Sequence, residues 1–355
     1  FYPAYPTYIE RRFSGNMEIP VEEVKAIFVD LVSSPEVKEL AQLIKKNLGR
    51  ELRPYDIWYN GFKAQSSLSE EELNTITQKK YPNPKAFEAD MPRMLQDLSF
   101  TKDQAEFLAS KIQVDGSRGA GHAWGAEMKS EKARLRTRIG AEGMNYKGYN
   151  IAVHEFGHNV EQTITLHDVD YYILHGVPNT AFTEALAFIF QQRDLNLLGL
   201  EEKNEAKTHN MALANLWSCY EIMGVSLVDM GVWEWMYAHP NANASELKTA
   251  VIEIAKEVWN HYFSESFGSK DEPILAIYSH MIDNPLYLSA YPIGQLTNFQ
   301  MEQQLDGKNF AEEVNRIYSA GRLTPKYWMQ NAVGGDLSSR PLLKASREAL
   351  EFFNP

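Results

Sequence analysis

Residues 154–158 read His-Glu-Phe-Gly-His, and this segment constrains the fold of the chain more than any other. Two histidines four residues apart meet only when the backbone is helical, because positions i and i+4 share one face of a helix. Their imidazoles can then bind one metal ion, and Glu155 lies where it can reach a water on that ion. The apolar residues 151–153 precede the segment. The pattern predicts a buried helix built around a metal site.

A third metal ligand is predicted at Glu184, which follows His158 after a gap of 25 residues. Glu184 lies in the strongly apolar segment 181–188, where a carboxylate needs a cation as its partner. His154, His158, Glu184 and a water would form the open tetrahedral site of a catalytic zinc. Two alternatives remain open: the histidines are ordinary core or surface residues, or Glu184 pairs with an arginine or lysine.

Glu161 and Asp168 are rival ligands, because both lie closer to the motif in the chain. Glu161 is three residues after His158 on the same predicted helix, too near in the chain to complete a tetrahedral shell comfortably. The third histidine that metzincins carry after a short glycine-containing spacer is absent. Glu184 is therefore the preferred third ligand.

Composition restricts the class of protein. The 355 residues suit one large domain or two smaller ones. The net charge of −12 argues against nucleic acid as a main partner. Cys219 is the single cysteine, which excludes an intrachain disulfide and a cysteine-rich zinc site, and its apolar surroundings predict a core position.

Two features bear on localisation. No apolar run approaches the roughly 20 residues that span a bilayer, so we expect no membrane span. The chain begins at Phe1, so either a leader was removed or the chain is part of a longer polypeptide. Localisation is left open on this ground.

Apolar periodicity predicts a mainly helical protein with a small sheet, of the α+β type. Helical patterns run from residue 20 to 50 and from 84 to 111, and a polar helix opens near Ser69. In residues 132–139 basic residues alternate strictly with Ala, Leu, Thr and Ile, which predicts a strand with one buried face. The glycine-rich segment 119–128 is a candidate partner or edge strand, able to bind a peptide as an added strand.

Two helices are predicted after the metal motif. Residues 178–180 open the helix that carries Glu184, and Asn284-Pro285 opens another, which Pro292 should kink. Tyr287 and Tyr291 would share a face of this second helix, shortly after His280. Their hydroxyls and the imidazole can stabilise an oxyanion, although such a tyrosine pair is more often packing.

With these residues in view, the chain resembles the thimet oligopeptidase and oligoendopeptidase F family of zinc metallopeptidases. Similar segments follow in the family's order over residues 50–340. They are the Leu-x-x-Tyr-Asp segment at 52–56, the glycine- and alanine-rich segment at 117–124, the zinc motif at 154–158, Thr-Glu-Ala at 183–185, the tyrosine-rich segment at 287–294 and the C-terminal segment 321–336.

The resemblance implies an enzyme that hydrolyses peptide bonds in short peptides with one zinc ion per chain. His154, His158 and Glu184 would be the metal ligands, and Glu155 would take the proton of a water that zinc makes acidic. His280, Tyr287 and Tyr291 would stabilise the oxyanion or hold the peptide backbone. By family analogy the protein would be cytoplasmic, and periplasmic or secreted if a leader was cleaved.

The chain departs from the family pattern in three places. Glu161 stands where the family often has a histidine, and the proline often found after the third ligand is absent. The helical region before residue 50 is also shorter than in the family. Residues 1–50 are therefore predicted to be an N-terminal helical part, the remnant of a larger channel wall, and residues 51–345 the catalytic domain. A missing N-terminal portion of the same polypeptide would complete that wall.

Two other functions remain open. A dipeptidyl carboxypeptidase would need a cation for the C-terminal carboxylate, and Arg134, Arg136 and Arg138 are candidates, although on a strand they suit a solvated face. A non-catalytic zinc-containing peptide-binding module would have no use for Glu155. An aminopeptidase is disfavoured, because a motif such as Gly-x-Met-Glu-Asn is absent before the zinc helix.

Overall fold

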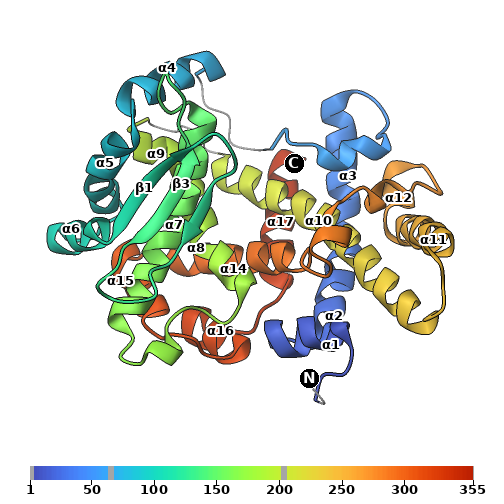
Figure 1. The fold of residues 1–355 in the computed structure, drawn as a ribbon. Helices are drawn as coiled ribbons and strands as arrows, with labels where there is room; N and C mark the ends of the chain where they lie inside the picture. Colours follow the sequence, from blue (N-terminus) through green and yellow to red (C-terminus); the bar gives the residue numbers. More distant parts are fainter. Residues whose placement is uncertain (1–3, 63–67, 201–205, 355) are drawn as a thin grey trace. The chain divides into compact units, whose positions relative to one another are not determined.

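The computed structural model describes residues 4–62, 68–200 and 206–354. They divide into two compact units, of which unit 1 comprises residues 1–64, 204–296 and 337–355, and unit 2 comprises residues 65–203 and 297–336. The described protein is mainly helical with one three-stranded sheet, which confirms the predicted fold class (Figure 1). The separation at residue 50 into a wall remnant and a catalytic domain stays a prediction.

Unit 1 is helical throughout its described part. Its longest helix, α10, packs against α2, α3, α11 and α17. Its elements are α1 (Tyr8–Glu10), the π-helix η1 (Arg11–Met17), α2 (Val21–Val32), α3 (Pro35–Leu48), the 3-10 helix η2 (Pro54–Trp58), α10 (Lys207–Ala238), α11 (Ala244–Tyr262), α12 (Ser264–Phe267), the 3-10 helix η4 (Ile274–Ala276), α13 (His280–Asp283) and α17 (Arg340–Phe353).

Unit 2 contains the sheet and the helix of the metal motif. Its elements are α4 (Glu70–Lys80), α5 (Pro84–Asp97), α6 (Lys102–Ser110), β1 (Ile112–Ser117), β2 (His122–Trp124), β3 (Ala133–Arg138), α7 (Tyr146–Asp168), the 3-10 helix η3 (Tyr172–Leu174), α8 (Thr180–Gln191), α9 (Asp194–Leu198), α15 (Phe310–Tyr318) and α16 (Pro325–Val333). Helix α14 (Ala290–Leu305) contributes residues to both units.

Helix α10 is the one described helix that is long and apolar enough to cross a membrane. Of its most apolar 18-residue window, 67% is buried inside the protein. Cys219 lies on this helix and is fully buried, as predicted. The burial of α10 is that of a core helix, so its composition is weak evidence for a membrane span.

The sheet of unit 2 has the strand order β1-β3-β2. Strand β3 alternates as predicted: Ala133, Leu135 and Thr137 are buried, and Arg134 and Arg136 are exposed. The glycine-rich segment supplies β2, which pairs antiparallel with β3 as an edge strand. Strand β1, which pairs parallel with β3, was not predicted, because its alternation covers only six residues.

The buried face of the sheet packs against α7 (Figure 1). The hydroxyl of Thr137 on β3 donates a 2.7 Å hydrogen bond to the carbonyl of Gly148 in α7. Fully buried aromatic rings then connect α7 to its helical neighbours: Phe156 lies 6.3 Å from Phe87 of α5 and 5.6 Å from Phe190 of α8, centre to centre. Because this core surrounds the metal motif, the backbone of α7 is held on several sides.

Two helix starts were predicted correctly. Ser69 caps α4 through a reciprocal hydrogen-bond pair with Glu72, and Asn179 caps α8 by accepting from the backbone N–H of Ala181. Each cap satisfies an amide that would otherwise lack a partner in the first turn of the helix.

The predicted helix start at Asn284-Pro285 is wrong, because α14 begins only at Ala290. Residues 284–287 form a turn in which Leu286 has φ +59°, a left-handed conformation that cannot continue a helix. The backbone N–H of Leu286 donates to the buried carboxylate of Asp229 at 2.8 Å, which stabilises this turn. Pro292 therefore lies in the first turn of α14, where its missing N–H requires no kink.

A network of charged side chains in unit 2 makes the free energy of unfolding depend on pH in the acidic range. The Asp90 carboxylate accepts 2.7 Å hydrogen bonds from Arg93 and from the hydroxyl of Tyr81, whose ring stacks on Tyr149 of α7. Burial raises the pKa of Asp90, but the bonds from Arg93 and Tyr81 and the charges of Arg93 and Lys80 outweigh it and lower the pKa to about 2. The ionised carboxylate is thus stabilised by the fold.

We expect Asp90 to contribute about 1–2 kcal/mol to stability above pH 4, after allowance for screening. Because its folded pKa is below the unfolded value, this contribution is lost as pH falls from about 4 to 2. Urea unfolding at pH 5.5 and pH 2.5 measures it. Asp90→Asn should be destabilised at pH 5.5, and its difference from wild type should shrink to about a third at pH 2.5, where most of the contribution has been lost. An equal difference at both values would contradict the assignment.

Candidate metal centre

His154 and His158 lie one turn apart on the same face of α7, as the motif predicts. Their ring centres are 4.9 Å apart. Glu184 reaches the same point from α8: its Oε2 atom is 3.5 Å from Nε2 of His154 and 3.8 Å from Nε2 of His158. All three side chains are mostly buried, with between 11% and 18% of their surface exposed.

The spacing of these three side chains fits a small cation. Their potential ligand atoms lie within 4.8 Å of one another, and no other such group of three or more His, Cys, Asp or Glu occurs in the described residues. Donors that bind a tetrahedral ion at about 2.0–2.2 Å are about 3.3–3.6 Å apart. The two Nε2–Oε2 distances, 3.5 and 3.8 Å, are close to this range. Two imidazoles and a carboxylate are also the donor set of many catalytic zinc sites.

Close contact between α7 and α8 at Gly157 lets Glu184 reach the histidines. A Cβ atom on Gly157 would lie 2.7 Å from the Cα atom of Ala187 and 2.8 Å from the carbonyl oxygen of Leu186. Both are backbone atoms of α8, so no side-chain rotation can relieve the overlap. Glycine at this position of the motif is therefore required by helix packing.

Gly157→Ala should destabilise the protein by about 1–3 kcal/mol or more, because α8 must move away from α7. The same movement withdraws Glu184, so zinc affinity should fall together with the melting temperature. Gly231→Ala on α10 is the matched control, since a Cβ there meets only a side-chain methyl of Ile254 at 3.0 Å. A Gly157→Ala protein with wild-type stability and zinc affinity would contradict this account.

Glu155 lies beside the three side chains but is not one of the grouped ligands. It is 8% exposed, and burial raises its pKa to about 7. A Cβ atom on Gly121 would lie 2.9 Å from Oε1 of Glu155, so the segment leading into β2 runs directly past this carboxylate. A buried carboxyl that titrates near neutrality has the property expected of a general base.

The neighbouring groups have pKa shifts with physical causes. Burial lowers the pKa of His158 to about 4, which favours the neutral imidazole that a metal requires. Burial also lowers the pKa of His154, but hydrogen bonding to Glu184 and its charge outweigh this and raise it. For Glu184 burial raises the pKa, and the bond to His154 and the charges of both histidines lower it overall. In the protonated form of His154, the proton on Nε2 would occupy the space next to Glu184 that a bound cation would take.

The rival ligands lie elsewhere. Glu161 is on α7 but is only 1% exposed and outside the ligand group, and burial raises its pKa to about 8. Asp168 is exposed at the C-terminal end of α7. His122 is exposed on β2, with its ring 5.5 Å from that of Trp124.

His280, Tyr287 and Tyr291 form a cluster of rings in unit 1. The centre-to-centre distances are 5.4 Å between the tyrosines, and 6.3 and 6.2 Å from His280 to Tyr287 and Tyr291. They meet although the two tyrosines do not share a helix: Tyr287 lies in the turn before α14 and Tyr291 in its first turn. The structure brings the three residues together, and their action on a substrate stays a prediction.

Gln191, at the C-terminal end of α8, is a further residue of the site that was not predicted from the sequence. Its Oε1 atom is 3.1 Å from Nδ1 of His154, the ring nitrogen that faces away from Glu184. Metal-binding histidines almost always use their second nitrogen in such a bond. The signal was present: Gln191 is seven residues after Glu184 and therefore on the same face of an otherwise apolar helix.

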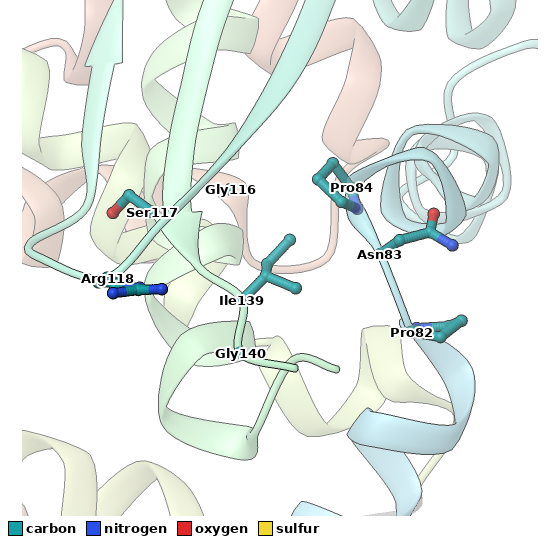
Figure 2. Close-up of a pocket in the computed structure, with 8 residues that line it drawn as sticks. All are labelled: Pro82, Asn83, Pro84, Gly116, Ser117, Arg118, Ile139 and Gly140. Atoms are coloured by element: carbon teal, nitrogen blue, oxygen red, sulfur yellow. The ribbon is translucent and has the colours of Figure 1, made fainter. Parts of the chain in front are cut away.

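A separate pocket of about 410 Å³ lies at the C-terminal ends of β1 and β3 (Figure 2). It is lined by residues 82–84 at the start of α5, by residues 116–118, and by Ile139 and Gly140. None of the three potential metal ligands lines it. This pocket is distinct from the metal centre.

No protein-family model and no curated protein matches this sequence. Solved structures do share its fold. PZ peptidase A matches over 96% of this chain and 59% of its own, with a TM-score of 0.61 and 14% identity. Metallocarboxypeptidase 1 of Trypanosoma cruzi matches over 96% of this chain and 68% of its own, with a TM-score of 0.56 and 14% identity. Oligoendopeptidase F of Enterococcus faecium matches over 99% of this chain and 55% of its own, with a TM-score of 0.54 and 12% identity.

These comparisons show that the chain shares its mainly helical fold with these three peptidases. Identities of 12–14% show a common fold and leave the particular family undecided. The chain spans 55–68% of the length of these three proteins. Both an oligoendopeptidase and a metallocarboxypeptidase are among them, so the fold does not separate the two activities.

Proposed function

We propose that this chain is a zinc peptidase that cleaves short peptides, with zinc held by His154, His158 and Glu184. The observation that carries the proposal is the convergence of these three donors beside the buried carboxyl of Glu155. The shared fold with known peptidases supports it. A binding module would have no use for a carboxyl group at this place, which disfavours the non-catalytic alternative.

Zinc would act as a Lewis acid that makes a water acidic enough to attack a peptide bond at neutral pH. Glu155 takes the proton of this water and later delivers it to the nitrogen of the leaving amine. His154, His158 and Glu184 would hold the ion. Tyr287, Tyr291 and His280 are proposed to donate hydrogen bonds to the developing oxyanion or to the peptide backbone.

The edge strand β2 is the proposed binding surface for the peptide. It pairs only with β3 in the described sheet, which leaves its other edge for an added strand. Gly121, which lies against Glu155, immediately precedes this strand. A peptide on the edge of β2 would thus pass close to the general base.

A carboxypeptidase is the second candidate, because two metallocarboxypeptidases share the fold. Two of the three candidate arginines of β3, Arg134 and Arg136, do not favour it. Arg134 pairs with Asp115 at 2.9 Å, and Arg136 lies over the ring of Trp124 at 4.9 Å, both on the exposed face. The oligopeptidase is therefore the preferred reading.

A mixed library of short peptides, with product masses read by mass spectrometry, tests both candidates. Cleavage that stops with a chelator, returns with zinc and is absent in Glu155→Gln would support a zinc peptidase. Cuts inside peptides with blocked ends would identify an oligopeptidase, and cuts only near a free C-terminus would identify a carboxypeptidase. No cleavage by a zinc-loaded wild-type protein would overturn the proposed activity.

A further inference from the structure

A chain of hydrogen bonds leads from His154 to a buried carboxylate through two amide side chains. Nδ1 of His154 is 3.1 Å from Oε1 of Gln191, and Nε2 of Gln191 donates to Oδ1 of Asn150 at 2.7 Å. Nδ2 of Asn150 donates to Oδ2 of Asp194 at 2.7 Å. All of these residues belong to unit 2.

Asp194 sets the direction of this chain. It is 7% exposed, and its carboxylate also accepts the backbone N–H of Leu195 and the hydroxyl of Tyr146, both at 2.6 Å. An ionised carboxylate can only accept hydrogen bonds. Asn150 must therefore present its NH₂ group to Asp194 and its oxygen to Gln191.

The orientation of Asn150 in turn fixes that of Gln191. Because the oxygen of Asn150 faces Gln191, Gln191 must turn its NH₂ group toward Asn150 and its oxygen toward His154. An oxygen at this position needs a proton on Nδ1 of His154. The lone pair of Nε2 then points to Glu184, 3.5 Å away. Two acceptors face each other there, an arrangement that a cation between them stabilises.

We propose that Asp194, acting through Asn150 and Gln191, fixes His154 in the Nδ1–H tautomer and so prepares Nε2 to bind the metal. The three are positioning residues, and none of them belongs to the group of potential metal ligands. The inference rests on the proposed metal centre but not on peptide hydrolysis. His158 needs no such chain, since it hydrogen-bonds the backbone of Thr183.

Two single variants and their combination test the direction of the bonds. Gln191→Glu places a second acceptor against the oxygen of Asn150, and if Asn150 turns over, its oxygen meets Asp194 instead. In the wild-type protein one oxygen of Asp194 accepts from the N–H of Leu195 and the other from the NH₂ group of Asn150. Asp194→Asn keeps only one side-chain oxygen, so one of these two hydrogen bonds is lost. Each change should weaken zinc binding by about 10–100-fold, the usual cost of disturbing the partners of metal ligands.

The double variant Gln191→Glu/Asp194→Asn reverses the direction of the chain. The new amide at position 194 donates to the oxygen of Asn150, the NH₂ group of Asn150 donates to the new carboxylate, and that carboxylate still accepts from Nδ1 of His154. We expect zinc affinity, measured by competition with a chromophoric chelator, to recover at least tenfold relative to Gln191→Glu. Additive losses in the double variant, or unchanged affinity in both single variants, would overturn the proposal.

Imidazole ¹H–¹⁵N spectra of the wild-type protein give a test that depends on no variant at these positions. The His154 signals are assigned by their loss in His154→Gln, and spectra at alkaline pH report the neutral ring. A proton on Nδ1 supports the proposal, and a proton on Nε2 overturns it. If wild-type protein failed to bind zinc, the proposed metal centre would fall, and these spectra would still decide the tautomer.

Discussion

Glu155→Gln should lower kcat for peptide hydrolysis by about 10²–10⁴-fold, while the zinc content stays at one ion per chain. General-base catalysis typically contributes a factor of this size. Glutamine has nearly the same shape as glutamate but cannot accept a proton in the physiological range. Because Glu155 lies outside the group of potential ligands, its replacement should leave the ion in place. Initial rates with a fluorogenic peptide and metal analysis of the same preparation measure both quantities.

Glu161→Gln is the matched control for this change. Glu161 is on the same helix and fully buried, but it lies outside the ligand group. Its replacement removes a buried carboxyl of raised pKa, so activity should stay within a few-fold of wild type and stability should not fall. A Glu155→Gln protein that kept half of the wild-type activity would rule out Glu155 as the general base.

Glu184→Ala should remove zinc binding at concentrations that saturate the wild-type protein. Loss of a direct ligand should exceed the roughly 10–100-fold cost of changes to outer partners. The effect should also appear in stability: at a zinc concentration of 100 Kd, binding stabilises wild-type protein by about 2.7 kcal/mol, and the variant should gain nothing. Thermal unfolding with and without zinc, after treatment with a chelator, measures this difference.

The same thermal unfolding measurements, with and without zinc, identify the third ligand. Glu161→Gln should retain the zinc-dependent stabilisation, because its carboxyl is not grouped with the histidines. If Glu184→Ala bound zinc like wild type and Glu161→Gln did not, the ligand set would be His154, His158 and Glu161. Such a result would restore the rival ligand that the sequence left open.

Features that depend on local pattern were predictable from the sequence. The i, i+4 spacing of His154 and His158 needs only a helix to place both rings on one face. The alternation in β3 needs only a strand, and capping residues such as Ser69 and Asn179 satisfy amides within their own helix. Each of these predictions concerns residues that are close together in the chain, so the local geometry of one helix or strand was sufficient to make it.

The turn before α14 was predicted wrongly for the converse reason. Asn284-Pro285 is a common helix start, but the backbone of Leu286 bonds to Asp229, a residue 57 positions earlier in the chain. Local propensity is weak compared with such a buried contact. Strand β1 was likewise recognisable only through its parallel partner β3.

The sequence by itself determined that α7 is a helix with two histidines on one face, and that Glu184 is a carboxylate in an apolar helix in need of a cation. The tertiary structure alone decided that Glu184 lies against both histidines, because α8 contacts α7 at Gly157 more closely than any side chain would allow. It also decided how His154 is oriented, since Gln191, Asn150 and Asp194 meet only after folding. Spacing along one element is a property of the chain, whereas a bond between elements exists only once burial has packed them together.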